Sequence, residues 1–367
     1  YYYIPFSMFT LRIYYNRNLY GEITGRTEIP RTYTEFISVC KQVETYTKKS
    51  GKPVVAIAGS KYHTTPMRDK YEYPFFVDLS RKTDFNLDGS ADVFETYQAY
   101  RKGLWDFTSP NLINGWACTK EVVSNFQYGW LAAFRADASF MFVQGRALMI
   151  ASGSWDAPSL LKQVGNLFDV GVFNFPMPVD HPEFGKYVRG PASEAETGPA
   201  IPWAITKNSK HPDLCIDFLR FCTTRANNQK FNESITWLPV INGAQLSPVL
   251  KPFKPVVEGF SGQFNFNIST EFKLRSEGFK WDLYSGKMTP EAYGKFLKER
   301  YDNTALAGYA IQMDSACKNN RNVERILASQ MFQNAFETGN KELISKKTGQ
   351  LLSSMQAGGY KISVDND

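Results

Sequence analysis

The sequence predicts an α/β fold, in which helices pack on the faces of a β-sheet. Two observations support this class. An amphipathic segment with clear start and stop signals, residues 32–51, is followed directly by a short apolar run at residues 52–60. Further strand-like apolar runs, at residues 141–155 and 169–178, are separated by helical segments. Helices that alternate with strands along a chain are typical of layered α/β proteins.

The first elements are marked by local signals. Residues 1–16 are rich in aromatic and β-branched side chains and predict a strand or a pair of strands. Thr32 and Glu35 have the spacing of a capping box, so a helix is expected to begin there and to end near Gly51. Its inner face is expected to comprise Phe36, Val39, Cys40, Val43 and Tyr46.

The remaining elements are predicted from apolar periodicity. Long helices are expected from residue 92 to about 105 and from residue 120 to about 134. Residues 200–207 predict a strand that leads into a helix with Pro212 in its first turn. The inner face of that helix is expected to comprise Leu214, Cys215, Phe218, Leu219 and Cys222.

A further helix is expected at residues 289–301, in the last third of the chain. Thr289 is its expected cap, and Pro290 occupies the first helical position. The tail after about residue 333 is polar and is expected to be partly mobile.

Composition excludes several function classes. The net charge is +6, but the basic residues are scattered, so no nucleic-acid surface is predicted. The five cysteines are far apart and include no CxxC pair, which argues against a zinc or redox site. The sequence contains no run of eighteen apolar residues, so no membrane span is predicted. Aromatic residues reach 15%, a share useful for both cores and flat binding surfaces.

Five segments carry motifs in a fixed order. The first two are "PFSMFTLRIYYNRNLY" (residues 5–20) and "IPRTYTEFISVCKQV" (residues 29–43). They are followed by "FMFVQGRALMIASGSWD" (residues 140–156), "GPAIPWAITKNSKHPDLCIDFLRFCTT" (residues 198–224) and "ESITWLPVINGA" (residues 233–244). In this order they resemble extracellular solute-binding proteins of carbohydrate-uptake ABC transporters, the family that includes maltose-binding protein.

The resemblance implies the type II periplasmic-binding-protein fold, with two α/β lobes, hinge strands between them and the ligand in the cleft. Family members carry further lobe-one residues before the crossing segment, so the chain is expected to be N-terminally truncated, with an incomplete first lobe. We assign residues 1–9 and 198–253 to partial lobe one with hinge segments, and residues 10–197 and 254–330 to lobe two. Residues 331–367 are assigned to a C-terminal tail.

Trp155 and Asp156 form the pair that a sugar site needs, since rings cover the C–H faces of a sugar and polar side chains bond its hydroxyls. Gly153 would let the backbone turn sharply and present the ring. The alternative is a buried Trp155, because large aromatic side chains are mostly buried. The resemblance places this tryptophan at the cleft. We therefore expect Trp155 to stack on a ligand, and Asp156 to cap the helix at residues 157–164 and to contact the ligand.

Phe6 and Ser7 are expected ligand residues, because the resemblance places them where the hinge faces the cleft. Trp203 and Trp237 are further expected ligand residues, for which packing within lobe one is an equal alternative.

Tyr62 follows a buried strand, where loops that reach a ligand are common. Glu194, in a polar loop, could bond a hydroxyl from the rim of the cleft, although a solvated loop glutamate is the simpler interpretation.

A calcium loop is predicted at residues 84–95, "DFNLDGSADVFE". Its spacing matches the EF-hand template, with Gly89 at the sharp turn and no clear helix entering it. The simpler interpretation is a turn whose polar side chains cap the next helix. The expected calcium ligands are Asp84, Asn86, Asp88, Ser90, Asp92 and Glu95.

The residues and the resemblance together predict a non-enzymatic, monomeric sugar-binding component of an ABC importer. It would be extracytoplasmic, bind membrane permeases, need no cofactor beyond a structural calcium ion, and have its signal region outside this chain. One alternative is a carbohydrate-active hydrolase, which would need two acids about 5–10 Å apart. Asp156 and Glu194 are the best guesses for such a pair. The other alternative is a binder of the same fold for a polyamine or peptide.

Overall fold

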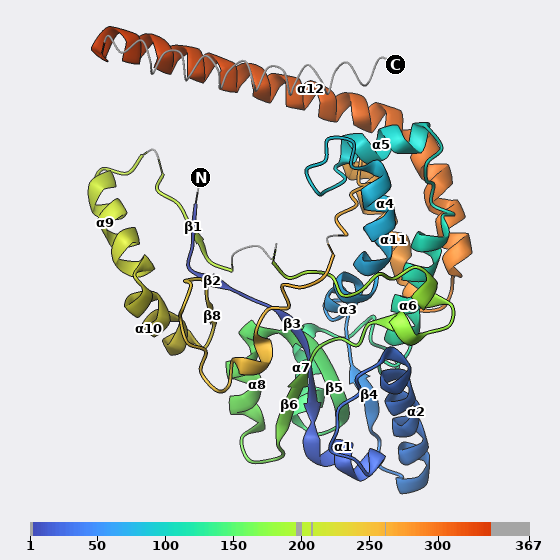
Figure 1. Ribbon diagram of the computed structural model, residues 1–367. Coiled ribbons are helices and arrows are strands. Elements are labelled where there is room, and N and C mark those ends of the chain that lie inside the picture. The colour runs from blue at the N-terminus through green and yellow to red at the C-terminus, as the bar shows by residue number, and fades with distance from the viewer. Residues whose placement is uncertain (1–2, 196–199, 207, 261, 339–367) are drawn as a thin grey trace.

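The computed structural model describes residues 3–195, 200–206, 208–260 and 262–338, with side chains described up to Asn319. It confirms the α/β class, because a four-stranded sheet is covered by helices on both faces (Figure 1). The strand order is β4-β5-β3-β6; β4, β5 and β6 run in one direction and β3 runs against them. The strands are β3 (Leu11–Asn16), β4 (Val55–Ala58), β5 (Ala147–Gly153) and β6 (Val170–Phe173).

Alternation along β3 shows how this sheet divides the core. Ile13 and Tyr15 point into the larger hydrophobic cluster, whereas Tyr14 between them belongs to a second, smaller cluster. The larger cluster includes side chains of α2, α3, α4 and α6, and the smaller includes those of α7 and α8. The helices of this part are α1 (Arg17–Thr24), α2 (Tyr33–Ser50), α3 (Thr64–Tyr71), α4 (Tyr73–Thr83), α5 (Val93–Arg101), α6 (Pro110–Val123), α7 (Arg135–Val143), α8 (Ala157–Val164) and α11 (Thr270–Tyr284).

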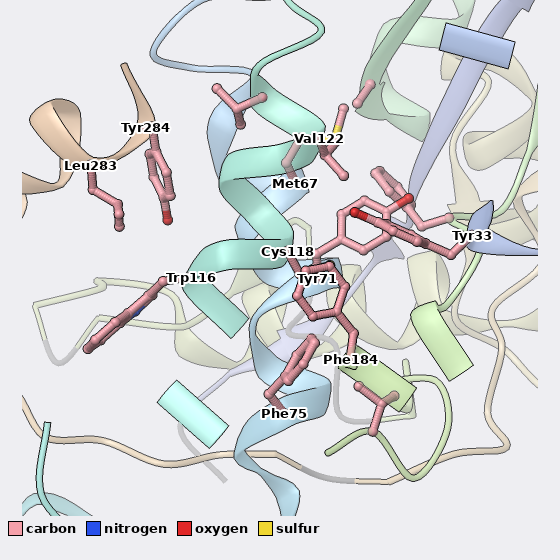
Figure 2. Close-up of a cluster of buried hydrophobic side chains, with 14 of the residues drawn as sticks. Tyr33, Met67, Tyr71, Phe75, Trp116, Cys118, Val122, Phe184, Leu283 and Tyr284 are labelled. Carbon is pink, nitrogen blue, oxygen red and sulfur yellow. The ribbon is translucent and has the colours of Figure 1, made fainter. Parts of the chain in front are cut away.

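Figure 2 shows the aromatic interior of the larger cluster, where α2, α3 and α6 meet. Tyr71 makes a T-shaped contact with Tyr33, with ring centroids 5.7 Å apart. Phe184 packs edge-on against Tyr33 and Phe75, at 6.0 Å in both cases. Such pairs contribute about 0.5–1.5 kcal/mol each beyond the area they bury, so they stabilise this half of the molecule.

A smaller part of the chain lies to the left of the sheet in Figure 1. It contains two short antiparallel ribbons, β1 with β7 and β2 with β8, and two helices. The N-terminal segment enters this part before it continues into β3 (Figure 1). Its elements are β1 (Ile4–Pro5), β2 (Ser7–Met8), β7 (Pro202–Trp203), β8 (Leu238–Pro239), α9 (Pro212–Thr223) and α10 (Arg225–Ile235).

The predicted inner face of α9 is wrong for the most part. Of its five residues only Leu219 is buried, while Leu214 and Phe218 are exposed. Periodicity correctly predicted the helix and its apolar stripe, but the described part of the chain contains nothing that covers most of that stripe.

Several boundaries differ from the predictions. The helix expected at residues 120–134 lies instead at α6, and the chain turns through Gly129 at φ +78° before α7. The helix expected to reach about residue 105 ends at Arg101. The strands predicted at 141–155 and 169–178 are shorter, because residues up to Val143 belong to α7 and β6 ends at Phe173. The helices α1, α3, α4, α7, α10 and α11 were not predicted.

The last helix, α12 (Pro290–Thr338), is much longer than predicted and runs across the top of Figure 1. The predicted polar tail falls partly on α12 and partly on residues 339–367, which lie outside the described residues. Across the described chain, every helix is too short or too polar to cross a membrane.

Candidate functional site

Three chain segments meet at one edge of the sheet. Because β4 and β5 are parallel, their carboxyl ends lie at the same edge, and the antiparallel β3 begins there. Tyr62 follows β4, Trp155 and Asp156 follow β5, and Phe9 precedes β3. In open α/β sheets, ligands bind outside the carboxyl ends of the strands. This edge is therefore the candidate site.

Trp155 is held in place by the backbone beneath it. A Cβ atom on Gly153 would lie 2.2 Å from the indole ring, so only glycine lets the ring lie against this strand end. Phe9 packs edge-on against the ring, with centroids 4.8 Å apart. The ring is half-buried and held on two sides. A fixed, partly exposed ring is suited to stacking on a flat ligand face.

Asp156 does not cap α8, so that prediction is wrong: its side chain makes no capping hydrogen bond. It forms an ion pair with Arg135 instead, in which the single nitrogen Nη2 lies 2.6 and 2.7 Å from the two carboxylate oxygens, and it accepts a hydrogen bond from Ser152. The Arg135 guanidinium also lies over the Tyr62 ring, 4.3 Å from its centroid. Sequence reasoning missed Arg135, because only the fold brings α7 to the end of β5.

His63 lies beneath this cluster and is buried. Its Nδ1 is hydrogen-bonded to the Ser60 hydroxyl at 2.9 Å, and its Nε2 has no partner among the described residues. Burial, reinforced by the Arg135 charge, lowers the pKa of His63 to about 4, so the ring is neutral at physiological pH. The loop is fixed further by Gln127, whose amide bonds both the N–H and the C=O of Gly59.

Phe6 and Ser7 are both fully buried, in contrast to the prediction that they face a cleft. The Ser7 hydroxyl donates to Asn232 Oδ1 at 2.6 Å, and the Asn232 amide donates to the Phe6 carbonyl at 3.0 Å. The Phe6 ring packs on Trp203, with centroids 5.0 Å apart. These contacts fasten the N-terminal segment to α10.

Trp203 is 39% exposed and presents part of its ring to solvent, while Trp237 is half-buried beside β8. Neither tryptophan contacts the cluster formed by Tyr62, Arg135 and Trp155 in the structure described. Their roles in ligand binding stay predictions.

Glu194 is neither solvated nor at a rim. Its side chain is 4% exposed and forms a bidentate pair with Arg12 of β3, at 2.8 and 3.0 Å. It also accepts from Lys70 at 2.5 Å and from the backbone N–H of Val256 at 2.7 Å. Burial alone would raise the pKa of Glu194, but hydrogen bonds from Arg12 and the charges of Lys70 and Arg12 hold it below its usual value. We call this group the Arg12–Glu194–Lys70 network.

In the loop at residues 84–95, the polar side chains bond the loop backbone. Asp84 accepts from the N–H groups of Asp88 and Gly89, and Glu95 forms a capping box with Asp92 at the start of α5. The prediction that no helix enters the loop is wrong, since α4 leads directly into it. As arranged here, no three His, Cys, Asp or Glu side chains of the described chain are placed to hold a metal ion. Calcium binding therefore stays a prediction.

The geometry of the sheet edge favours binding over catalysis. The two acids that a hydrolase would use, Asp156 and Glu194, are each engaged by basic side chains. The edge offers a fixed ring, a guanidinium, a carboxylate and a phenol instead, which suit a ligand with flat faces and hydroxyls. This combination of fold and side chains is typical of proteins that bind a small solute at the carboxyl end of an α/β sheet.

Comparison with known proteins gives the family. The profile of the bacterial extracellular solute-binding protein family matches residues 1–253, and the chain belongs to this family. A curated relative, the "Multiple sugar-binding protein" of Streptococcus mutans, is 25% identical over 233 residues. That alignment covers 63% of this chain and 49% of the relative, so the chain spans about half the length of the relative.

Solved structures show the same fold. A family 1 extracellular solute-binding protein from Bifidobacterium longum subsp. infantis is 17% identical with a TM-score of 0.55, over 82% of this chain and 73% of that one. The GacH receptor of Streptomyces glaucescens is 16% identical with a TM-score of 0.55, over 82% and 70%. A chitin oligosaccharide binding protein is 17% identical with a TM-score of 0.51, over 83% and 72%. The type II solute-binding fold expected from the sequence is thus confirmed.

Proposed function

We propose that the protein is the substrate-binding component of an ABC importer and captures a sugar or oligosaccharide at the sheet edge. The observation that carries this proposal is the Trp155 ring, fixed on Gly153 and flanked by polar side chains of Tyr62, Arg135 and Asp156. Membership of the solute-binding family and the curated relative named for multiple sugars support it.

Each group at the edge has a role in this proposal. Trp155 covers one C–H face of the sugar ring, and Phe9 and Gly153 prevent the indole from turning away. Arg135 donates to sugar hydroxyls, while Asp156 accepts from them and keeps Arg135 in position. The neutral His63 supports the loop from below without adding charge. Mixed donors and acceptors suit hydroxyls, which need both.

We further propose that the protein acts outside the cytoplasm, as a monomer, and delivers its ligand to the permease subunits of the importer. Binding would shift an equilibrium between open and closed arrangements of the two parts, so affinity would depend on contacts made only in the closed form. Residues 8–10, which connect β2 to β3, are one place where bending is expected.

A panel of ligands tests the proposal. We expect one or more neutral mono- or oligosaccharides to raise the melting temperature, because a ligand that binds only the folded state stabilises it. Spermidine and short peptides serve as representatives of the two non-sugar alternatives. Stabilisation by those compounds and by no sugar would contradict the proposal.

A further inference from the structure

A cavity lies away from the sheet edge. It has a volume of about 530 Å³ and is bounded by α3, α4, α11 and residues 262–267. This volume falls within the usual range for small-molecule sites, about 300–1,000 Å³. Helix α3 separates the two places: the Tyr62 loop lies before its first residue, and the cavity lies at its carboxyl end. Its eight residues span about 12 Å, so one sugar ring cannot contact both places.

The cavity is lined by buried titratable groups that are not part of the sheet-edge site. Glu72 is 4% exposed and accepts a hydrogen bond from the buried hydroxyl of Tyr284. Burial raises the pKa of Glu72 to about 7, although Arg68 and Tyr284 oppose the shift. A buried carboxyl poised between its two protonation states within a cavity is typical of functional sites.

Arg68 is incompletely satisfied. Its guanidinium reaches Glu277 and Asp69 only at 3.5 Å, and its Nε is buried without a hydrogen-bond partner in the described part of the chain. An unmade hydrogen bond of a buried polar group costs about 1–3 kcal/mol. A ligand oxygen in the cavity would remove that cost.

Aromatic side chains form the remaining wall. Trp116 and Phe76 are buried and Tyr73 is 39% exposed, and all three line the cavity. Figure 2 shows Trp116 and Tyr284 on one side of the buried cluster, away from Tyr33. Flat rings beside hydrogen-bonding groups are the combination that a sugar ring needs.

The charges identify the class of ligand. Arg68, Lys273 and Lys280 line the cavity together with Glu72 and Glu277, and Lys280 is paired with Glu277. An anion would meet the carboxylates, and a cation would meet Arg68 and the lysines. A neutral ligand whose hydroxyls both donate and accept fits this alternating set.

We propose that this cavity is a second carbohydrate site, which holds one neutral sugar ring between the aromatic wall and the polar side chains of Arg68, Glu72 and Lys280. The inference rests on the proposed function, because it takes the same class of ligand. It adds that the chain binds sugar at two separate places.

Fluorine NMR of 5-fluorotryptophan-labelled protein tests the proposal with two local reporters. The chain has seven tryptophans, and the resonances of Trp116 and Trp155 are assigned by substituting each with phenylalanine. Glucose, galactose, xylose and N-acetylglucosamine are titrated singly to millimolar concentration. We expect at least one sugar to shift both resonances, with separate dissociation constants.

Variants link the Trp116 signal to the cavity. Lys280→Met and Glu72→Gln are expected to weaken the Trp116 titration at least about tenfold and to leave the Trp155 titration unchanged. Lys287→Met is the matched control, since Lys287 is exposed just beyond α11 and does not line the cavity. Lys280→Met alone decides the outcome if Glu72→Gln does not fold.

The contrary outcomes are distinct. A shift of Trp155 without any shift of Trp116 would overturn the second site and leave the proposed function intact. A Trp116 shift with sodium phosphate or glucuronate but with no neutral sugar would overturn the ligand class. If no sugar shifts either resonance, the proposed function and this inference both fail.

Discussion

At the scale of single residues, Gly153 determines where the indole ring of Trp155 lies. Gly153→Ala would place a methyl group within the ring, yet its backbone, at φ −83°, accepts alanine without strain. We therefore expect Gly153→Ala to fold normally, to displace the ring and to weaken sugar binding at least about tenfold, because the stacking geometry is lost. Calorimetric titration measures this change.

The control for this substitution is Gly278→Ala in α11. A Cβ atom there meets nothing within 4 Å, and alanine is favoured in a helix. Sugar affinity should be unchanged in Gly278→Ala. Equal affinity of Gly153→Ala and the wild type would show that the ring position does not matter.

His63 couples the stability of the site to pH. The pKa of its imidazole is near 6.5 in the unfolded chain and about 4 in the folded one, so the unfolded state binds more protons between these values. Stability is therefore lost as the pH falls from about 6.5 towards 4, by about 2 kcal/mol at pH 5. Urea unfolding at pH 7 and pH 5 should show a smaller loss for His63→Asn than for the wild type. An equal loss in both would contradict this account.

Residue roles were predictable only where the cause is local. The sequence alone predicted that Trp155 lies at the end of a strand next to Gly153, because both residues belong to one short segment. The partner of Asp156 was not predictable, since Arg135 lies 21 positions away and reaches it only through packing of α7 on the sheet. Glu194 was misjudged for the same reason: its partners come from β3 and α3.

At the scale of elements, the Arg12–Glu194–Lys70 network joins β3, α3 and two later segments. Removing one partner of a buried ion pair leaves an uncompensated charge and costs about 3–5 kcal/mol. We expect Glu194→Gln to lower the free energy of unfolding by roughly that amount. Urea denaturation of the wild type and the variant provides the measurement.

Glu183→Gln is the matched control. Glu183 forms an exposed pair with Lys186, and such surface pairs contribute only about 0–1 kcal/mol. If both variants lost the same free energy of unfolding, the Arg12–Glu194–Lys70 network would stabilise the protein no more than a surface ion pair does.

The loop between α4 and α5 gives a separate prediction. If residues 84–95 bind calcium, Glu95 must leave its capping box to act as a ligand. Calcium at about 100 times its dissociation constant would then stabilise the protein by about 2.7 kcal/mol. Thermal unfolding with and without excess calcium tests this. Asp84→Asn should reduce the rise in melting temperature, and no rise in the wild type would refute the calcium site.

Helix boundaries were predicted well where capping signals are strong. The capping box of Thr32 and Glu35 and the left-handed Gly51 define α2 as predicted. The start of α6 was missed although Ser109 and Pro110 mark it, because apolar residues continue past its end and suggested a later helix. In α11 the apolar residues form no clear stripe, so periodicity could not reveal it.

At the scale of the whole molecule, the central claim is that a solute-binding fold captures sugar at the carboxyl edge of its sheet. The order of motifs predicted the family and the fold, since both depend on many segments together. It could not predict which side chains meet at the edge, because Phe9, Tyr62, Arg135 and Trp155 come from four separate segments.

One measurement tests this claim most directly: calorimetric titration of the wild type, Trp155→Ala and Tyr128→Ala with the sugar that stabilises the protein most. Tyr128 is a fully exposed aromatic residue outside the site and serves as the control. The account predicts saturable binding by the wild type and by Tyr128→Ala, and an affinity at least about tenfold weaker in Trp155→Ala, because one stacked ring contributes more than about 1.4 kcal/mol. An unchanged dissociation constant in Trp155→Ala would contradict it.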